Sequence, residues 1–440
     1  MSKVKFLFPI ITAMALSACN GNSIIEITSN STKSINSTTE EYHSSLSIPK
    51  EHAINNPKKT FNNAYTNQNE AYIQSVKGFA LDFYKISDSV FSPLSIATCY
   101  SMLYDCAKEE SKAELEKMLH YNDSFNYLDE IKTMLLNNAI DDQDKGTYLD
   151  ISQSMWVHDT FEQYLSKNYA DILQDYYFAE AFKGDLESDE MHELLTNYIN
   201  DKTRNFLDVK KEVFKEYGRV MWLVNTIYMK SHWVNEFEEY ENSKGKFSNI
   251  DSKSKEANYM NNTRFGSFYR GEKYTISSLN LNGNFTFTIL LPDEKENYEE
   301  ILSDDAAIKD MLNYQSLSMK IHDYIHYQIP QFKVQKAYDL EEELRKLGVT
   351  YIFDSDRANL SGISDKPLRE NLFVARSRHE AGIELTNGGI EAAAYTIIDI
   401  APKSAAPIEN PFEFVVDHPF AYVLSNREGL PLFMGAIKNI

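Results

Sequence analysis

The sequence predicts an α+β fold, and two features of its pattern carry that prediction. Apolar residues recur at helical spacing from residue 69 to about residue 203, whereas alternating apolar and polar runs dominate from about residue 220 onward. Helices that come first and strands that follow argue for α+β rather than for alternating βαβ units. The chain has 440 residues, 42% of them hydrophobic, which is enough for one large domain or two ordinary ones.

The N-terminus has the pattern of an export signal. Lys3 and Lys5 precede an apolar run that is too short to span a bilayer, so we expect residues 1–18 to be a signal peptide. The small residues directly before Cys19 resemble the lipobox of bacterial lipoproteins, which implies cleavage before Cys19 and lipidation of its thiol and amine. An ordinary signal peptide with an incidental cysteine is the alternative. We expect a lipoprotein of the bacterial outer membrane or cell surface, anchored by several acyl chains.

Residues 19–68 are predicted to be the lipidated Cys19 followed by a disordered tether. The segment is rich in Ser, Thr, Asn and Lys, and its few apolar residues recur at no period. Globular sequence begins near residue 69 and continues to residue 440. The other two cysteines, Cys99 and Cys106, are seven residues apart on a predicted helix, about 10 Å along its axis. That distance excludes a mutual disulfide, and we expect two buried thiols.

The predicted helices and strands follow in order along the globular region. Residues 69–86 carry an apolar stripe at helical spacing, and Ser92 with Pro93 begins a second helix. Further helices are expected near residues 111–121, 126–138, 162–176 and 191–203. Strands are expected over residues 220–233, 274–292, 318–334 and 412–440, and Asn282-Gly283 marks a hairpin in the second of these. One helix interrupts them at residues 338–349 and ends at Gly348.

Nothing in the sequence supports catalysis, a cofactor or a metal. The motifs GxSxG, HExxH, GxGxxG and GxxxxGK[ST] are absent. His192-Glu193 lacks the second histidine of a zinc protease, and His322 and His326 share a strand face without further ligands nearby. The net charge of −21 makes nucleic acid an unsuitable partner. We therefore expect a protein that is not an enzyme and that uses no cofactor.

Several separate stretches are similar to the serpin family of serine protease inhibitors. They lie in family order from about residue 69 to the C-terminus, and they read VFSPLSI (90–96), LVNTIYMKSHW (223–233), QIPQFKV (328–334), ANLSGI (358–363), RHEAGIELTNGG (378–389) and DHPFAYVLSNREGLPLFMGAI (417–437). The resemblance implies one serpin domain over residues 69–440, with three β-sheets, about eight or nine helices and an exposed reactive-centre loop at residues 387–411. It also implies a monomer whose partners are serine proteases.

The resemblance assigns positions to several single residues. It implies that Ser92, Ser95, Asn225 and His379 form the shutter, a polar cluster beneath the middle of the large sheet. Trp233 would lie at the breach, the upper end of the sheet where the loop first enters. Taken alone, each of these residues also fits a local cap, a polar core residue or a core aromatic.

Five positions depart from the family pattern. Cys106 and Ser231 stand where glycines are usual. The loop usually begins Glu-Glu-Gly-Thr, but residues 387–390 here read Asn-Gly-Gly-Ile. Ile390 is bulky for the first residue to enter a sheet, although it is apolar and β-branched and so suits a strand. Ile390 therefore weakens the inhibitory interpretation without excluding it.

The loop divides into a strand-forming part and a cleavable part. Residues 389–400 alternate, with one face apolar except for Thr396 and the other bearing both charges, as a strand entering a sheet requires. Pro402 and Pro407 then bound an extended segment that cannot complete a ladder of hydrogen bonds. The residues expected at the hinge, where the loop begins to enter the sheet, are Gly389, Ile390, Glu391, Ala392, Ala393 and Ala394.

The resemblance implies suicide inhibition of a protease that cleaves the loop. Register along the loop gives Lys403-Ser404 as the reactive bond, and a lysine there suits trypsin-like enzymes with an acidic specificity pocket. Cleavage then lets the loop insert into the large sheet while the protease is held as an acyl-enzyme. The alternatives are an inhibitor of elastase-like or cysteine proteases that acts through Ala401 or Ala405, and a non-inhibitory serpin-fold binding module.

Overall fold

The protein has the predicted α+β fold. The computed structural model describes residues 8–15, 46–57, 66–215, 218–251, 253–294, 298–390 and 410–440. Within these ranges the chain forms ten α-helices and two hydrogen-bonded sheets of nine and eight strands. Seven of the ten helices precede β6 (Met221–His232), as predicted, but strands that the sequence did not predict lie among them at Ile140–Asp142, Thr147–His158 and Glu180–Gly184.

The helices are one or two more than the eight or nine expected. The excess is accounted for by α5 and α8, which have only four and five residues. The helices are α1 (Glu70–Tyr84), α2 (Pro93–Cys106), α3 (Glu109–Met118), α4 (Tyr127–Asn137), α5 (Asp159–Glu162), α6 (Lys167–Tyr177), α7 (Asp189–Lys202), α8 (Tyr298–Leu302), α9 (Asp305–Leu312) and α10 (Leu340–Lys346).

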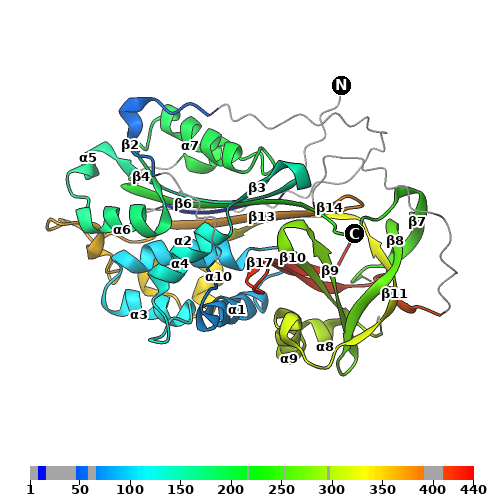
Figure 1. The fold of residues 1–440 in the computed structure, drawn as a ribbon. Coiled ribbons are helices and arrows are strands. Elements are labelled where there is room, and N and C mark those ends of the chain that lie inside the picture. The colour runs from blue at the N-terminus through cyan, green and yellow to red at the C-terminus, as the bar shows by residue number, and fades with distance from the viewer. Residues whose placement is uncertain are drawn as a thin grey trace.

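The nine-stranded sheet crosses the middle of the molecule. Figure 1 shows α7 on one face of this sheet and α1, α2 and α10 on the other. Its strands run in the order β1-β13-β14-β6-β4-β5-β2, with β12 beside β13 and β3 beside β4. Their bounds are β1 (Phe8–Ala15), β2 (Ala53–Asn55), β3 (Ile140–Asp142), β4 (Thr147–His158), β5 (Glu180–Gly184), β6 (Met221–His232), β12 (Phe332–Asp339), β13 (Arg376–Thr386) and β14 (Gly389–Ile390).

The eight-stranded sheet corrects the prediction of three separate sheets. Its order is β15-β11-β8-β9-β10-β16-β17, with β7 beside β8. The 17 residues of β8 pair with β11 through Tyr259–Phe268 and with β9 through Phe268–Arg270, so one long strand joins the two halves of this sheet. The bounds are β7 (Ser243–Ser248), β8 (Ser254–Arg270), β9 (Tyr274–Leu281), β10 (Phe285–Pro292), β11 (Ile321–Pro330), β15 (Phe412–Val415), β16 (Phe420–Ser425) and β17 (Pro431–Ile437).

Two short sequence signals predicted local structure correctly. The hairpin expected at Asn282-Gly283 joins β9 to β10, and Gly283 has φ of +71°, a conformation that glycine adopts without a steric cost. Helix α2 begins as expected, because the Ser92 side chain accepts a hydrogen bond from the Ser95 amide and Pro93 occupies the first turn. Both predictions depended on a single turn or cap and not on distant contacts.

Helix α2 is held between the two sheets. Thirteen of its fourteen residues are buried, as expected for a helix covered all round. The residue before its cap, Phe91, forms a bridge with Met434 of β17, and the Cys99 thiol lies against the Leu223 carbonyl of β6 at 3.9 Å. Cys99 and Cys106 are free, buried thiols as predicted, and burial raises the pKa of Cys106 to about 12. The helix is a fixed base beneath the centre of the nine-stranded sheet.

The folded region begins earlier than the predicted boundary at residue 69. Residues 46–57 include β2, whose Ala53 and Asn55 pair with Phe182 and Ala181 of β5. The Asn55 side chain accepts a hydrogen bond from the Ala181 amide at 3.1 Å, and Leu46 packs against the core beneath α7. The sequence predicted a tether throughout residues 19–68 because these residues show no periodic apolar pattern. A three-residue edge strand such as β2 is held by backbone hydrogen bonds and does not require such a pattern, so composition could not reveal it.

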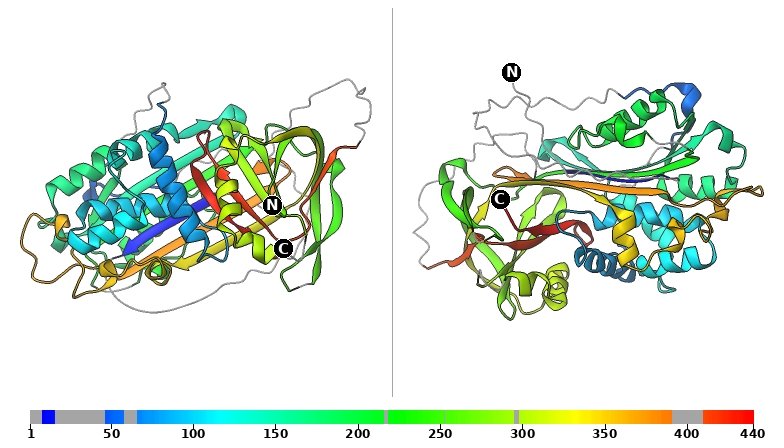
Figure 2. Two further views of the ribbon diagram at one scale, coloured as in Figure 1. Left: turned by 90° about the horizontal axis from the view of Figure 1, so that it is seen from below. Right: turned by 180° about the vertical axis from the view of Figure 1, so that it is seen from behind.

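Part of the predicted signal peptide lies in the nine-stranded sheet. Residues Phe8–Ala15 form β1, which pairs antiparallel with β13 on one side and with β6 on the other. In Figure 2 this dark-blue strand lies beside the orange β13. Because β6 and β13 are each antiparallel to β1, they are parallel to one another. The space between them is called the gap below.

Candidate functional site

The residues with expected roles fall into two groups. Cys19, the hinge residues Glu391, Ala392, Ala393 and Ala394, and the reactive bond Lys403-Ser404 lie outside the described residues. The start of the hinge, the shutter and the breach are described, and they surround the gap. The geometry of the gap therefore decides what the loop can do.

The hinge enters the upper end of the gap. Gly389 and Ile390 form β14, which pairs antiparallel with Leu385 and Thr386 of β13 and with Ser231 and His232 of β6. β14 thus begins a strand between the two parallel neighbours, directly above the positions paired with β1. The described part of the chain before the loop therefore ends within the sheet, paired on both sides.

Gly389 is required at this point by close contacts. Its φ is +143°, and a Cβ on this residue would lie 2.2 Å from the Ser231 carbonyl oxygen and 2.7 Å from the His232 Cα. Both are backbone atoms that cannot move aside without breaking the strand pairing. Glycine is therefore the residue that lets the loop turn into the gap.

Ile390 is accommodated within the sheet. Its side chain is fully buried in the main hydrophobic core, on the face of the sheet that it shares with Ser231 and Leu385. The large side chain of Ile390, which weakened the inhibitory interpretation of the sequence, therefore does not prevent this residue from lying within the sheet.

Burial disfavours charge around the upper end of the gap. The pKa of Glu384 is raised by burial, which the Lys333 amine at 2.8 Å partly offsets. Burial also lowers the pKa of His232, and the nearby Lys230 lowers it further. An apolar first residue such as Ile390 suits this environment better than a charged one.

The four shutter residues meet beneath the middle of the gap. The Ser92 amide donates to His379 Nε2 at 3.0 Å, and the Ser95 hydroxyl donates to Asn225 Oδ1 at 2.6 Å. All four side chains are fully buried. Helix α2 is thus hydrogen-bonded to β6 through Asn225 and to β13 through His379, which are the two strands that flank the gap.

Trp233 lies at the end of β6 beside the residues that lead into the loop. Its indole Nε1 donates to the Thr386 carbonyl at 2.9 Å, and its backbone amide donates to the Gly388 carbonyl at 3.2 Å. The ring packs edge-on against Phe237 and Phe287. Trp233 therefore fixes the residues from which the loop departs.

A ring of side-chain amides at the base of the loop was missed by sequence reasoning. The Asn387 side chain donates to the Phe237 carbonyl and to Asn242 Oδ1, each at 2.8 Å, and accepts from Asn242 Nδ2 at 3.0 Å. Gln331 Nε2 also donates to Asn387 Oδ1. The sequence showed only that Asn387 replaces an acidic residue, whereas the fold shows that a neutral amide here pairs with two other amides.

Comparison with known proteins identifies the family. A family model described as Serpin (serine protease inhibitor) matches residues 74–440. The chain belongs to the serpin family. This serpin is 29% identical to human Serpin B7 over 257 residues, a match that spans 55% of this chain and 65% of that protein. It is 27% identical to ovalbumin of Dromaius novaehollandiae over 369 residues, which is 79% of this chain and 92% of ovalbumin.

Solved structures support the fold of this serpin. The native-state crystal structure of Tengpin, a thermophilic serpin, superposes with a TM-score of 0.72 at 21% sequence identity. The superposition covers 86% of this chain and 96% of Tengpin. Serpins are in general inhibitors of proteases and not catalysts, although the homologues include non-inhibitory members.

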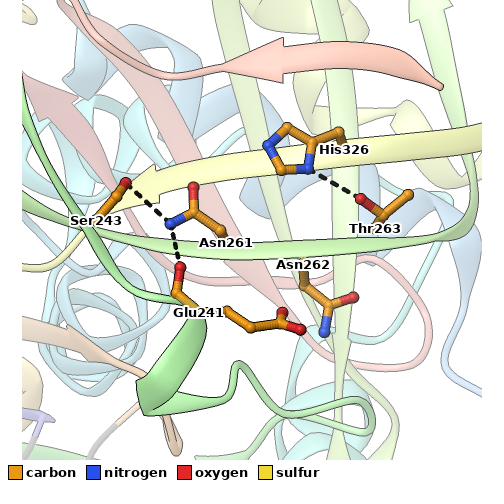
Figure 3. A pocket seen from close by; sticks show the side chains of 6 residues that line it. All are labelled: Glu241, Ser243, Asn261, Asn262, Thr263 and His326. Atoms are coloured by element: carbon orange, nitrogen blue, oxygen red, sulfur yellow. Dashed lines mark hydrogen bonds between the residues drawn. The ribbon is translucent and has the colours of Figure 1, made fainter. Parts of the chain in front are cut away.

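A polar pocket lies on the eight-stranded sheet of this serpin, and its lining residues Glu241 and Ser243 flank Asn242 of the amide ring (Figure 3). Asn261 Nδ2 donates to the Glu241 carbonyl at 2.7 Å and to the Ser243 hydroxyl at 3.0 Å, and Thr263 bonds His326 Nδ1 at 2.9 Å. These polar groups hold β8 to its neighbouring segments. Thr263 and His326 form a hydroxyl–imidazole pair, but no carboxylate among the described residues is hydrogen-bonded to the imidazole to orient it as a base.

The described ranges hold neither a metal-binding cluster nor a membrane-spanning helix. No group of three His, Cys, Asp or Glu side chains among those residues is arranged to hold a metal ion. No helix within them is long and apolar enough to cross a bilayer.

Proposed function

We propose that this serpin inhibits serine proteases by inserting its cleaved loop into the gap. The observation that carries this proposal is β14, where Gly389 and Ile390 already pair with both β6 and β13. A strand that continued from Ile390 would run between β6 and β13 and could form backbone hydrogen bonds with both of them. β1 supports the proposal further, because it shows an eight-residue antiparallel strand accommodated there.

The chemistry begins as ordinary proteolysis. The protease serine oxygen bonds to the carbonyl carbon of Lys403, the Lys403–Ser404 peptide bond breaks, and the Ser404 nitrogen leaves as an amine after taking a proton. The freed strand then enters the gap and carries the attached protease with it before water can hydrolyse the ester. Insertion forms on the order of ten to fifteen backbone hydrogen bonds at about 0.5–1.5 kcal/mol each, which is comparable with the stability of a whole domain.

Specificity for trypsin-like enzymes rests on Lys403 as the residue before the cleaved bond. An acidic specificity pocket binds a lysine side chain. Cleavage after Ala401 or Ala405 by elastase-like or cysteine proteases is the competing choice. Incubation with a panel of proteases, followed by sequencing of the released C-terminal peptide, decides between them, and we expect a peptide that begins at Ser404.

The proposal is tested by trapping. Trypsin mixed with the full chain is expected to form a complex that survives boiling in detergent, because the acyl bond is covalent. The Lys403→Ala variant is the matched control and is expected to form no complex with trypsin. If trypsin only cleaves the loop and is never trapped, the proposal fails for that class of enzyme.

A non-inhibitory serpin is the second candidate function. The replacement of the usual acidic pair by Asn387 and Gly388 favours it, as do the non-inhibitory members among the homologues. The two functions differ in what cleavage does to stability. Insertion is expected to raise the unfolding midpoint of the cleaved protein far above that of the intact protein, whereas an unchanged midpoint favours a binding module.

We further propose that the serpin is a bacterial lipoprotein anchored through Cys19 at the outer membrane or cell surface. The support is the lipobox-like sequence before Cys19 and the basic, apolar leader. Removal of residues 1–18 would take β1 out of the gap and leave that space to the loop. Labelling of cells with a radioactive fatty acid tests the anchor: the wild type is expected to be labelled, and Cys19→Ala is expected to lose the label.

A further inference from the structure

Three cross-strand pairs of side chains lie in a row on one face of the eight-stranded sheet. Residues directly opposite one another in an antiparallel pair project to the same side, and every second residue of a strand returns to that side. The pairs join β8 to β11, and they are Asn261 with Gln328, Thr263 with His326, and Phe265 with Tyr324. We call this row the strip. It changes from amide and hydroxyl groups at one end to aromatic rings at the other.

The aromatic end of the strip is open to solvent. Phe265 is 63% exposed and Tyr324 is 44% exposed, and their ring centroids lie 5.7 Å apart in an edge-on arrangement. The ring of His322, two residues before Tyr324 on β11, lies 16° from the plane of the Phe265 ring. Single exposed apolar residues are common on protein surfaces, whereas several rings gathered on one sheet face indicate a contact site.

The polar end of the strip is hollowed into the pocket of Figure 3. The volume of this pocket is about 530 Å³, within the range of roughly 300–1,000 Å³ found for small-molecule sites. Hydrogen bonds fix its walls, because Gln328 Nε2 donates to Asn261 Oδ1 at 3.0 Å and Asn262 Nδ2 donates to the Glu236 carbonyl at 3.1 Å. A pocket whose walls are already held loses little conformational entropy when a ligand binds.

Three polar groups of the pocket are left for a ligand. The Glu241 carboxylate, Asn262 Oδ1 and His326 Nε2 have no hydrogen-bond partner in the described part of the chain. The first two accept hydrogen bonds, and the imidazole nitrogen donates or accepts according to its tautomer. No lysine or arginine is among the described residues that line the pocket, and Glu241 repels anions. The pocket therefore suits a neutral ligand that is rich in hydroxyl donors.

A sugar combines the two properties that the ends of the strip require. Its hydroxyl groups form hydrogen bonds around the edge of the ring, while the C–H groups on the faces of the ring are apolar and pack on an aromatic side chain. Thr263 and Phe265 are two residues apart, about 6.8 Å along the strand, so adjoining units of one oligosaccharide would reach both ends. An apolar peptide would cover the rings but leave the polar groups of the pocket without partners, which would cost affinity.

We propose that the strip binds a neutral oligosaccharide. One sugar unit stacks on Phe265 and Tyr324, and the next donates hydroxyl hydrogen bonds to Glu241 and Asn262. The strip belongs to the eight-stranded sheet and the gap to the nine-stranded one, so glycan binding and protease inhibition can be measured separately. The inference goes beyond the proposed function, because it concerns the kind of glycan-bearing surface that holds the serpin.

Binding of the full chain to an array that carries neutral and sulfated oligosaccharides tests the proposal. Phe265→Thr removes the ring but keeps a β-branched residue that suits a strand. Glu241→Gln removes the charged acceptor, and its matched control is Glu239→Gln, the same change on a nearby carboxylate that does not line the pocket. Ile54→Ala is the control for loss of exposed apolar surface, since Ile54 lies on β2 of the other sheet. The unfolding midpoint of each variant shows that it is folded.

The wild type is expected to bind a set of neutral oligosaccharides. Phe265→Thr and Glu241→Gln should each weaken that binding about tenfold, as expected for the loss of one stacking or hydrogen-bonding contact. Glu239→Gln and Ile54→Ala should bind as the wild type does. The proposal is overturned if no neutral glycan is bound, if only sulfated glycans are bound, or if Phe265→Thr and Glu241→Gln bind like the wild type.

Trypsin trapping is measured on the same samples and should be equal in all variants. A failure of the proposed function would appear as absent trapping with glycan binding intact. A failure of the glycan proposal would appear as absent or unaltered glycan binding with trapping intact.

Discussion

At the scale of single residues, Gly389 shows how a family position is fixed by a contact that the sequence does not display. Gly389 is kept although the residues around it differ from the usual start of the loop. Why a glycine is needed at this position can be seen only in the folded structure. A Cβ on Gly389 would lie 2.2 Å from the Ser231 carbonyl oxygen. That oxygen belongs to β6, more than 150 residues away along the chain.

Gly389→Ala is predicted to expel the hinge from the gap. The strained φ and the backbone clash together should destabilise the intact protein by about 1–3 kcal/mol. Chemical unfolding measures this loss, and counting the trypsin trapped per molecule of inhibitor measures its effect on insertion. Ile390→Val is the control, because it keeps an apolar β-branched residue at the next position and should change both quantities little. An unchanged unfolding midpoint in Gly389→Ala would contradict the close contact.

Asp105 is a second residue whose role depends on its surroundings. Burial raises the pKa of its carboxyl to about 6, although hydrogen bonds from the Tyr127 and Tyr177 hydroxyls oppose that rise. Asp105 lies in the last turn of α2, whereas Tyr127 belongs to α4 and Tyr177 belongs to α6. One carboxyl therefore joins three helices.

The Asp105 carboxyl is predicted to make stability fall as pH rises from about 4 to about 6. In that range the folded protein holds a proton on Asp105 that the unfolded chain has released, so folding is favoured by acid. Asp105→Asn removes the titration and should reduce the pH dependence of the unfolding free energy by on the order of 2–3 kcal/mol between pH 4 and pH 7. Urea unfolding of both proteins at several pH values measures it, and identical pH profiles would refute the assignment.

At the scale of elements, the helix caps, the hairpin and the alternation of the loop were predictable because each is encoded within a few residues. The shutter was not predictable from periodicity, since Ser92 and His379 are 287 residues apart and meet only through the fold. The family resemblance supplied that pairing. The amide ring was missed for the same reason, because Asn242, Gln331 and Asn387 come from three distant segments and no family pattern marks them.

The amide ring is predicted to hold the loop base in place. In Asn387→Asp the carboxylate can no longer donate to the Phe237 carbonyl or to Asn242 Oδ1, and a charge is brought into a mostly buried position. The unfolding free energy at pH 7 should fall by about 1–3 kcal/mol. Asn280→Asp, an amide on the exposed side of β9, is the control and should change little. Equal losses in the two variants would mean that Asn387 is not specially held.

At the scale of the whole molecule, the register of the sheet gives the N-terminal strand β1 and an extension of β14 the same place between β6 and β13. Extending β14 residue by residue would bring Ala392–Asp399 opposite the same residues of β6 and β13 that Phe8–Ala15 of β1 pairs with. The sequence showed an apolar leader and a strand-like loop but gave no sign that they fit the same gap. That relation depends on the register of four strands, which only the assembled sheet defines.

Because one gap cannot hold both strands, the full chain is predicted to inhibit trypsin more slowly while β1 is present. Thr12→Pro removes a backbone donor from the centre of β1 and should free the gap. Its rate of trypsin trapping is expected to exceed that of the full wild-type chain several-fold, as measured from the appearance of the detergent-stable complex over time. Ala13→Val keeps β1 strand-compatible and should trap trypsin at the wild-type rate. If Thr12→Pro traps no faster, β1 leaves the gap before insertion becomes limiting, and the leader does not compete with the loop.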